Sequence, residues 1–317
     1  AVGHYKGGLA MAPILACGGF AAVSGSSLAT AATMTSIAMP SMRRYKYADR
    51  LSTASVAAGG TLGILIPPSV IMVIYGSMTE TSIGKLFIAG VVPGILGILF
   101  YLMAVTWTVW RDPSAGPAGD HMPRSEKLKA FGQVWLILVL FLIVMGGIYL
   151  GVFTATEAAG IGAAGAFIIA LLRRSLTFGA LFTILAATVR TTAMLMSILI
   201  GALIFANFIN VAGVPSAVVN AINSLGLPPL GIIFGLIVFY ILLGAVFDEL
   251  AMILLTIPVF FPLVMGLGFD PVWFGIVIVM VVEIGLICPP IGMNLFVIKA
   301  AVGNVPLTTM FRGIIPF

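Results

Sequence analysis

The stretch that decides the fold is GILIPPSVIMVIYG, residues 63–76, which places two adjacent prolines inside an uncharged run from residue 51 to residue 79. Proline lacks a backbone donor and its ring clashes with the preceding helical turn, so the pair predicts a break in any helix here. The same arrangement returns in GLICPPIGMNLFVI, residues 285–298. Two breaks of one kind inside apolar segments need a structural reason.

Composition places the chain in a membrane. Hydrophobic residues make up 61% of its 317 residues and charged residues 8%, with a mean hydropathy of +1.21. These values exclude an ordinary water-soluble domain. A helix needs about 20 apolar residues to span a bilayer, because its amides must be satisfied within the segment. Uncharged runs of at least this order occur at 86–110, 130–156 and 191–247, so we predict an all-α polytopic membrane protein.

Lysine and arginine gather in four clusters, which predict the orientation of the chain. If helices alternate between them, all four lie on one side, and the positive-inside rule makes that side cytoplasmic. These cations flank apolar spans, which argues against a nucleic-acid surface. The proline- and glycine-rich stretch that follows the uncharged run at 86–110 predicts a flexible cytoplasmic loop at 111–130. The clusters are Arg43, Arg44, Lys46 and Arg50; Arg111, Arg124, Lys127 and Lys129; Arg173 and Arg174; and Lys299 and Arg312.

An internal repeat relates the two proline pairs. A shift of 222 residues places Pro67 and Pro68 on Pro289 and Pro290, and it also aligns SSLA with DELA further upstream. Agreement of this spacing over a long stretch predicts a duplicated unit. We therefore divide the chain into a first unit at 1–80 (hairpin 7–42, broken helix 47–80), intervening and scaffold helices at 81–212, a second unit at 213–303 (hairpin 230–264, broken helix 271–300) and the start of a further helix at 304–317.

Each unit opens with a segment of awkward length. Residues 7–42 carry no charge, which is too long for one crossing and too short for two. We predict a re-entrant helical hairpin with the polar SGSS, residues 24–27, at its tip. The second hairpin has FDEL, residues 247–250, at the same place. Non-helical backbone at this depth is tolerated only where it is buried in protein or lines a water-filled cavity.

The breaks leave carbonyl groups without donors, and a dehydrated cation such as sodium is a suitable partner for them. The half-helix that begins after a break points its positive end into the same space, where a carboxylate could bind. Four crossings between the units, at about 86–110, 131–152, 156–172 and 191–212, with an interfacial helix at 175–190, place the units in opposite orientations. This inverted arrangement is typical of secondary transporters with a site at the membrane midplane.

Five strings together resemble the large membrane subunit of tripartite ATP-independent periplasmic (TRAP) transporters, the DctM-like permeases, over essentially the whole chain. The resemblance implies a subunit that is not an enzyme and that imports an organic-acid anion, such as a dicarboxylate or sialic acid, across the bacterial inner membrane. It implies a sodium gradient as the driving force, sodium ions in place of any cofactor, and an elevator motion of the hairpins. The strings are SGSSLATAATMTSIAMP (24–40), GGTLGILIPPSVIMVIYG (59–76), LFIAGVVPG (86–94), DELAMILLTIPVFFP (248–262) and CPPIGMNLFVIK (288–299).

The resemblance also implies two partners and further helices. A periplasmic binding protein (DctP-like) delivers the substrate, and a small membrane subunit (DctQ-like) braces the scaffold. Family members have helices before position 1 and one completed after Phe317. Because the chain opens without methionine and stops inside an apolar segment, we expect both ends to be cut.

The candidate site combines hairpin tips and breaks. The alternative for the serines is that they bond to their own helix carbonyls while the small residues allow close packing; the alternative for the acids is that their tip opens to water. The first cation site is predicted from Ser24, Ser26, Ser27, Gly59, Gly60 and Thr61. The second is predicted from Phe247, Asp248, Glu249, Gly285 and Cys288. Substrate-binding candidates are Ser27, Thr30, Pro67, Pro68, Ser69 and Asn294, and the hinges are Gly63, Pro67, Pro68, Gly285, Pro289 and Pro290.

Three charged or polar residues keep more than one interpretation. Glu283 could carry a proton, bind a cation or pair with a helix end. Asn294 could contact substrate or cap a helix. Arg190 could attract the substrate carboxylate, but it is expected to snorkel to the cytoplasmic interface. A proton-coupled carrier using Glu249 or Glu283, and an anion channel with opposed tips, remain the alternative functions.

Overall fold

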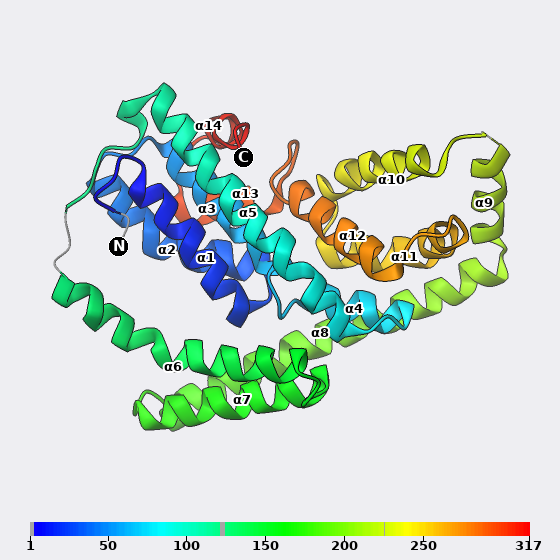
Figure 1. Cartoon of the computed structure of the whole chain (residues 1–317), viewed down its shortest axis with the longest axis horizontal. Helices are drawn as coiled ribbons and strands as arrows, with labels where there is room; N and C mark the ends of the chain where they lie inside the picture. The colour runs from blue at the N-terminus through cyan, green and yellow to red at the C-terminus, as the bar shows by residue number, and fades with distance from the viewer. Residues whose placement is uncertain (1–2, 121–123, 225) are drawn as a thin grey trace.

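A computed structural model describes residues 3–120, 124–224 and 226–317 of the chain. Within these ranges the secondary structure is helical, without a strand, which confirms the predicted all-α class (Figure 1). Five helical stretches in the described ranges are long and apolar enough to cross a membrane. They are Asp49–Thr79, Ile83–Arg111, Ala155–Leu172, Phe178–Val211 and Glu249–Gly266. The chain is therefore a multi-pass membrane protein.

The first unit consists of four helices. α1 (Gly8–Ser24) and α2 (Ser27–Arg44) form a hairpin, and α3 (Asp49–Leu65) and α4 (Val70–Thr79) lie on either side of the first proline pair. The α3 side chains from Leu51 to Leu65 are buried because this helix packs on α1, α2, α5 and α14. α3 ends at the prolines, and Ser69 begins α4 by accepting a hydrogen bond from Met72 N.

The second unit has the same order of elements. α10 (Pro229–Gly244) and α11 (Glu249–Gly266) form its hairpin, and α12 (Pro271–Gly285) and α13 (Met293–Val302) flank the second proline pair. α2 and α11 have the same length, 18 residues, and their first residues, Ser27 and Glu249, are 222 positions apart. The peptide bond within each proline pair is cis.

The second half-helix of each unit packs against the hairpin of the other unit. α4 of the first unit packs on α11, the second arm of the other hairpin, and α13 of the second unit packs on α2. α3 and α12 also contact each other directly. In Figure 1 the first unit, blue to cyan, and the second unit, yellow to orange, therefore meet in the middle of the molecule, where α13 lies beside α3.

Between the units lie α5 (Ile83–Arg111), η1 (Pro113–Ala115), α6 (Arg124–Tyr149), α7 (Ala155–Leu172), α8 (Phe178–Val211) and α9 (Val214–Ser224); α14 (Leu307–Ile314) follows the second unit. α6 and α7 lie side by side. On α8 only Ala202 and Ile209 are buried among the described side chains. Its apolar surface therefore faces a lipid-like environment or another subunit.

The separate interfacial helix predicted at 175–190 is wrong. α8 runs without interruption from Phe178 to Val211, joining that segment to the crossing predicted at 191–212. No proline lies inside this stretch, and the single charge of Arg190, which is exposed, does not end a helix. The short helix α9 was not predicted.

The loop predicted at 111–130 is shorter than expected among the described residues: 112–120 are irregular apart from η1, whereas 124–130 are helical. Residues 124–130 belong to α6, and residues 112–119 fold back on the start of the chain. Gly7 N donates to Gly116 O at 2.8 Å, and Arg50 pairs with Asp112 at 2.5 Å. The Ser114 hydroxyl, and after it Arg50, hold the pKa of the Asp112 carboxyl below its usual value. Local capping and ion pairing thus override the proline and glycine content; residues 121–123 lie outside the described residues.

Candidate functional site

The first hairpin tip is a tight turn tied together by hydroxyl groups. Gly25 adopts a left-handed conformation with φ 60°, which glycine tolerates at little cost. Thr30 donates to the Ser26 carbonyl at 2.7 Å, and its hydroxyl lies 2.6 Å from that of Ser24. Ser26 accepts from Ala29 N and so caps α2. The serines therefore do what short polar side chains do at a helix start, and the tip keeps several oxygen atoms close together.

This tip lies directly against the first break. A methyl group added at Gly63 would come within 2.7 Å of the Ser26 carbonyl oxygen and 2.9 Å of the Thr30 hydroxyl. A methyl group at Gly25 would lie 3.0 Å from the Pro68 carbonyl oxygen. The tip and the broken helix thus pack closely together because both contact points are glycines.

The second tip contacts the second break in a related way. The Asp248 side chain caps α11 by accepting from Leu250 N and Ala251 N at 3.1 and 3.4 Å. Ile291 N, in the break, donates to the Ala245 carbonyl at 3.3 Å. Gly285 lies against Gly244 of the hairpin, where an added methyl group would come within 2.8 Å of backbone.

The two tips also meet each other. Ser27 Oγ donates to Glu249 Oε2 at 3.0 Å, across 222 residues of sequence. Both side chains are buried, with 0% of Ser27 and 6% of Glu249 exposed. A buried carboxylate is costly unless it is hydrogen-bonded. This contact therefore joins the hairpins at the position where each unit begins its second arm.

A cavity of about 350 Å³ opens beside the first tip and break. Ser24, Gly25, Pro68 and Ser69 contribute its polar and backbone groups, and α8 covers it with apolar side chains. The size is within the range of small-molecule sites. The remaining lining residues are Val70, Val73, Ile74, Leu195, Met196 and Leu199.

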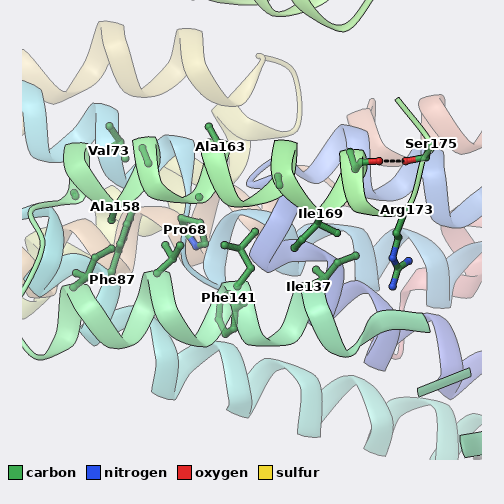
Figure 2. Close-up of a pocket in the computed structure, with 18 residues that line it drawn as sticks. Pro68, Val73, Phe87, Ile137, Phe141, Ala158, Ala163, Ile169, Arg173 and Ser175 are labelled. Atoms are coloured by element: carbon green, nitrogen blue, oxygen red, sulfur yellow. Dashed lines mark hydrogen bonds between the residues drawn. The ribbon is translucent and has the colours of Figure 1, made fainter. Parts of the chain in front are cut away.

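A larger cavity of about 570 Å³ lies between α6 and α7 and reaches Pro68 (Figure 2). Figure 2 shows apolar side chains such as Phe141 and Ile169 along it, with Arg173 and Ser175 at one end. An anion there would lie mostly against hydrocarbon. We therefore place the candidate site at the tips and breaks.

The structure gathers only part of the predicted first cation set at the tip. Ser24 and Ser26 are there, and Ser27 turns to Glu249. The three residues chosen before the break serve other contacts. Gly59 packs on Cys17 and Ile14, Gly60 packs on Ala31, and Thr61 donates to the Ala58 carbonyl at 2.8 Å. Gly63, predicted only as a hinge, is the residue of α3 that approaches the tip.

The predicted second cation set is similarly divided. Asp248 and Glu249 lie at the tip, as described above, whereas the Phe247 side chain is 46% exposed. Gly285 packs on the hairpin, and Cys288 N donates to the Gly285 carbonyl at 3.2 Å, inside the break.

The predicted substrate residues lie in two places. Pro68 and Ser69 line the cavity of about 350 Å³, with Ser27 and Thr30 in the adjacent tip. Asn294 is buried on α13, where its Nδ2 donates to the Ala57 carbonyl of α3 at 3.3 Å. The Asn294 Oδ1 has no hydrogen-bond partner among the described residues. Pro67, Pro289 and Pro290 lie in the breaks.

Sequence reasoning missed the pairing of Ser27 with Glu249, although one signal was available. The 222-residue shift that aligns the proline pairs also aligns these two positions. Equivalent positions of two similar units are candidates for a contact where the units meet. The contribution of α8 to the cavity had no comparable signal, because residues 195–199 are apolar apart from Ser197, like much of this helix.

An all-helical, multi-pass membrane protein with paired hairpin tips and broken helices at its centre is a transport protein by class. The sequence model of the DctM component of tripartite ATP-independent periplasmic transporters matches residues 1–317. The chain therefore belongs to this family of TRAP transporter permeases, as its sequence predicted, and is a transporter rather than an enzyme.

Relatives of this chain are named for different substrates. The C4-dicarboxylate TRAP transporter large permease protein DctM of Pseudomonas aeruginosa is 42% identical over 100% of this chain and 74% of its own length. The sialic acid TRAP transporter large permease protein SiaM of Vibrio cholerae is 34% identical over 99% of this chain and 73% of its own. The isethionate TRAP transporter permease protein DctMQ of Oleidesulfovibrio alaskensis is 37% identical over 99% of this chain and 49% of its own.

Proposed function

We propose that this permease imports an organic-acid anion across the bacterial inner membrane by symport with sodium. The observation that carries the proposal is the junction of the two tips through Ser27 and Glu249, beside both breaks. The relatives named for C4-dicarboxylates, sialic acid and isethionate support an anionic substrate. A periplasmic binding protein delivers the anion, and a small membrane subunit supports the permease; the relative named DctMQ is in keeping with such a second subunit.

The two units are proposed to be inverted repeats. Support comes from the equal lengths of α2 and α11, their 222-residue offset and the reciprocal packing of α4 on α11 and α13 on α2. Reciprocal contacts are what a twofold relation between the units requires. In an elevator motion, both units would move together against the intervening helices.

Each tip is proposed to bind one cation. At the first tip, the Ser24 hydroxyl and the Ser26 carbonyl supply neutral oxygen atoms close together, and the Pro68 carbonyl faces Gly25 of the same tip. At the second tip, Asp248 and Glu249 supply charge. Oxygen ligands of these kinds suit hard cations, and unwound backbone carbonyls bind sodium in transporters of this general design.

The substrate carboxylate is proposed to bind in the cavity of about 350 Å³ at the start of α4. The amide groups that begin a helix attract an anion, and Ser69 marks that start. The hydrogen bond between Ser27 and Glu249 then closes the centre of the site, so it must open when ions or substrate leave.

Sodium replacement in proteoliposomes tests this function. Uptake of labelled C4-dicarboxylate by the intact permease, with a binding protein present, should saturate and should stop when potassium replaces sodium at fixed pH. Uptake that continues in potassium and follows a proton gradient would instead establish the proton-coupled carrier, to which the buried Glu249 is suited. Flux that does not saturate would establish a channel.

A further inference from the structure

Glu283 lies in a small polar cluster, separate from both tips, where three helices cross. Its side chain on α12 is 5% exposed, and the Thr61 hydroxyl of α3 lies close to its carboxyl group. The Thr61 hydroxyl is also 3.2 Å from the Tyr101 hydroxyl of α5. α3, α5 and α12 contact one another pairwise. Three oxygen-bearing side chains thus converge in a region that is otherwise apolar.

The hydrogen bonds of this cluster are incomplete. Glu283 Oε1 has no hydrogen-bond partner among the described residues. The one hydrogen of the Thr61 hydroxyl is donated to the Ala58 carbonyl at 2.8 Å, and Tyr101 has a single hydrogen to share. Leaving a buried carboxyl oxygen unpartnered costs free energy comparable to a lost hydrogen bond, and more if the group is charged. The cluster therefore has more acceptors than donors.

We infer that Glu283, Thr61 and Tyr101 bind a monovalent cation of the size of sodium at the crossing of α3, α5 and α12. One carboxylate balances one positive charge, and two hydroxyl oxygens add neutral ligands of the kind that hard cations prefer. The cation supplies what the cluster lacks, a partner for the unpaired oxygen. Thr61 then belongs to this site and not to the tip, in agreement with the direction of its side chain.

The positions of these residues explain why there is one such site and not two. Thr61 and Glu283 are equivalent under the 222-residue shift that relates the units. Under the proposed twofold relation they lie near the same axis as Ser27 and Glu249, on the first halves of the broken helices. A cation held there would tie α3 to α12 while the tips open and close.

The competing explanation is a permanently neutral acid. A protonated Glu283 would donate one hydrogen bond to a hydroxyl and would need no cation. Glutamine has nearly the same shape and is neutral at every pH, so it imitates that state. Glu283→Gln therefore separates the two explanations.

Sodium-dependent thermal stability of the intact permease in detergent tests the inference. Sodium chloride is titrated against choline chloride at constant ionic strength, and the sodium concentration for half-maximal stabilisation is measured. We expect Glu283→Gln to raise this concentration by about tenfold or more, as loss of a metal-site group does, and Thr61→Val and Tyr101→Phe to raise it less.

Tyr240 and Thr256 provide the matched control. Their hydroxyls form a similar, partly buried pair at 2.7 Å in the second hairpin, so Tyr240→Phe and Thr256→Val remove the same atoms from another place. Their sodium response should equal that of the original protein. If Glu283→Gln does not fold, Thr61→Val and Tyr101→Phe against these controls decide the question.

A sodium response of Glu283→Gln, or of both hydroxyl variants, that matches the controls would overturn the inference. The inference rests on the proposed sodium symport only for the identity of the ion, and the two can fail separately. Sodium-driven uptake by the original protein together with an unchanged response in the variants would reject this site alone. Proton-driven uptake together with a lost sodium response in Glu283→Gln would reject the proposed coupling and support the site.

Discussion

The first and second units share a design but differ in the chemistry of their tips. At equivalent positions, the first tip has Ser26 and Ser27 and the second has Asp248 and Glu249. Ser26 and Asp248 both cap the helix that follows, so the structural task is the same. The charge is not. The comparison shows that the two tips share a capping geometry, whereas one offers neutral oxygens and the other supplies negative charge.

The breaks differ as well. The first spans residues 66–69 and ends at Ser69, which caps α4 with its side chain. The second spans residues 286–292 and ends at Gly292, whose left-handed φ of 59° replaces a side-chain cap. The shorter break ends in a side-chain cap, whereas the longer one is held by backbone hydrogen bonds such as Ile291 N to the Ala245 carbonyl.

Removing the Glu249 charge from the second tip should have the largest effect, because it reduces the difference in charge between the two tips. Glu249→Gln keeps an acceptor for Ser27 but removes the charge, so sodium-driven uptake should be lost while the protein still folds. Uptake in proteoliposomes and a thermal unfolding curve measure the two effects. Glu126→Gln, an exposed acid on α6, is the control. Normal uptake by Glu249→Gln would show that the difference between the tips is not functional.

Crowding the contact between the first tip and α3 should have the next largest effect. In Gly63→Ala, the methyl group meets the Ser26 carbonyl, and overpacking of this kind costs about 1–3 kcal/mol. Uptake should fall because the tip must move. Gly235→Ala adds a methyl group in open space on α10 and gains the helix propensity of alanine, so it should lower neither stability nor uptake. Equal behaviour of the two alanine variants would show that the tip and the break do not touch.

These residues also show what sequence can and cannot predict. The proline pairs predicted where α3 and α12 end, because the loss of a donor and the ring clash are local effects. Composition predicted an all-helical membrane protein because a helix in hydrocarbon satisfies its amides within its own segment. Sequence could not predict that Gly63, and not Gly59 or Gly60, contacts the tip. Each glycine faces a different neighbour, and only the packing of three helices determines which one meets the tip.

Removing the hydrogen bond between the tips should have a moderate effect. Ser27→Ala leaves Glu249 buried without its partner, which costs about 1–3 kcal/mol. The unfolding temperature should fall, and sodium should restore less of it than in the original protein. Ser36→Ala, which removes an exposed hydroxyl bonded to its own helix, is the matched control on α2. A stability of Ser27→Ala equal to that of Ser36→Ala would place the tips apart.

Substitutions at the residue that ends each break should have the smallest effects on stability. Ser69→Ala removes the cap of α4 and should cost about 1 kcal/mol. Gly292→Ala places a side chain at positive φ and should cost about 1–2 kcal/mol. Thermal unfolding measures both. No loss in either variant would mean that the breaks are held by tertiary packing alone.

The sodium dependence of uptake tests most directly whether two unlike tips each bind a cation. Initial rates for the intact permease in proteoliposomes, measured against sodium concentration at fixed pH and membrane potential, should be sigmoidal with a Hill coefficient above one. A hyperbolic curve in the original protein, or uptake that does not depend on sodium, would contradict the account.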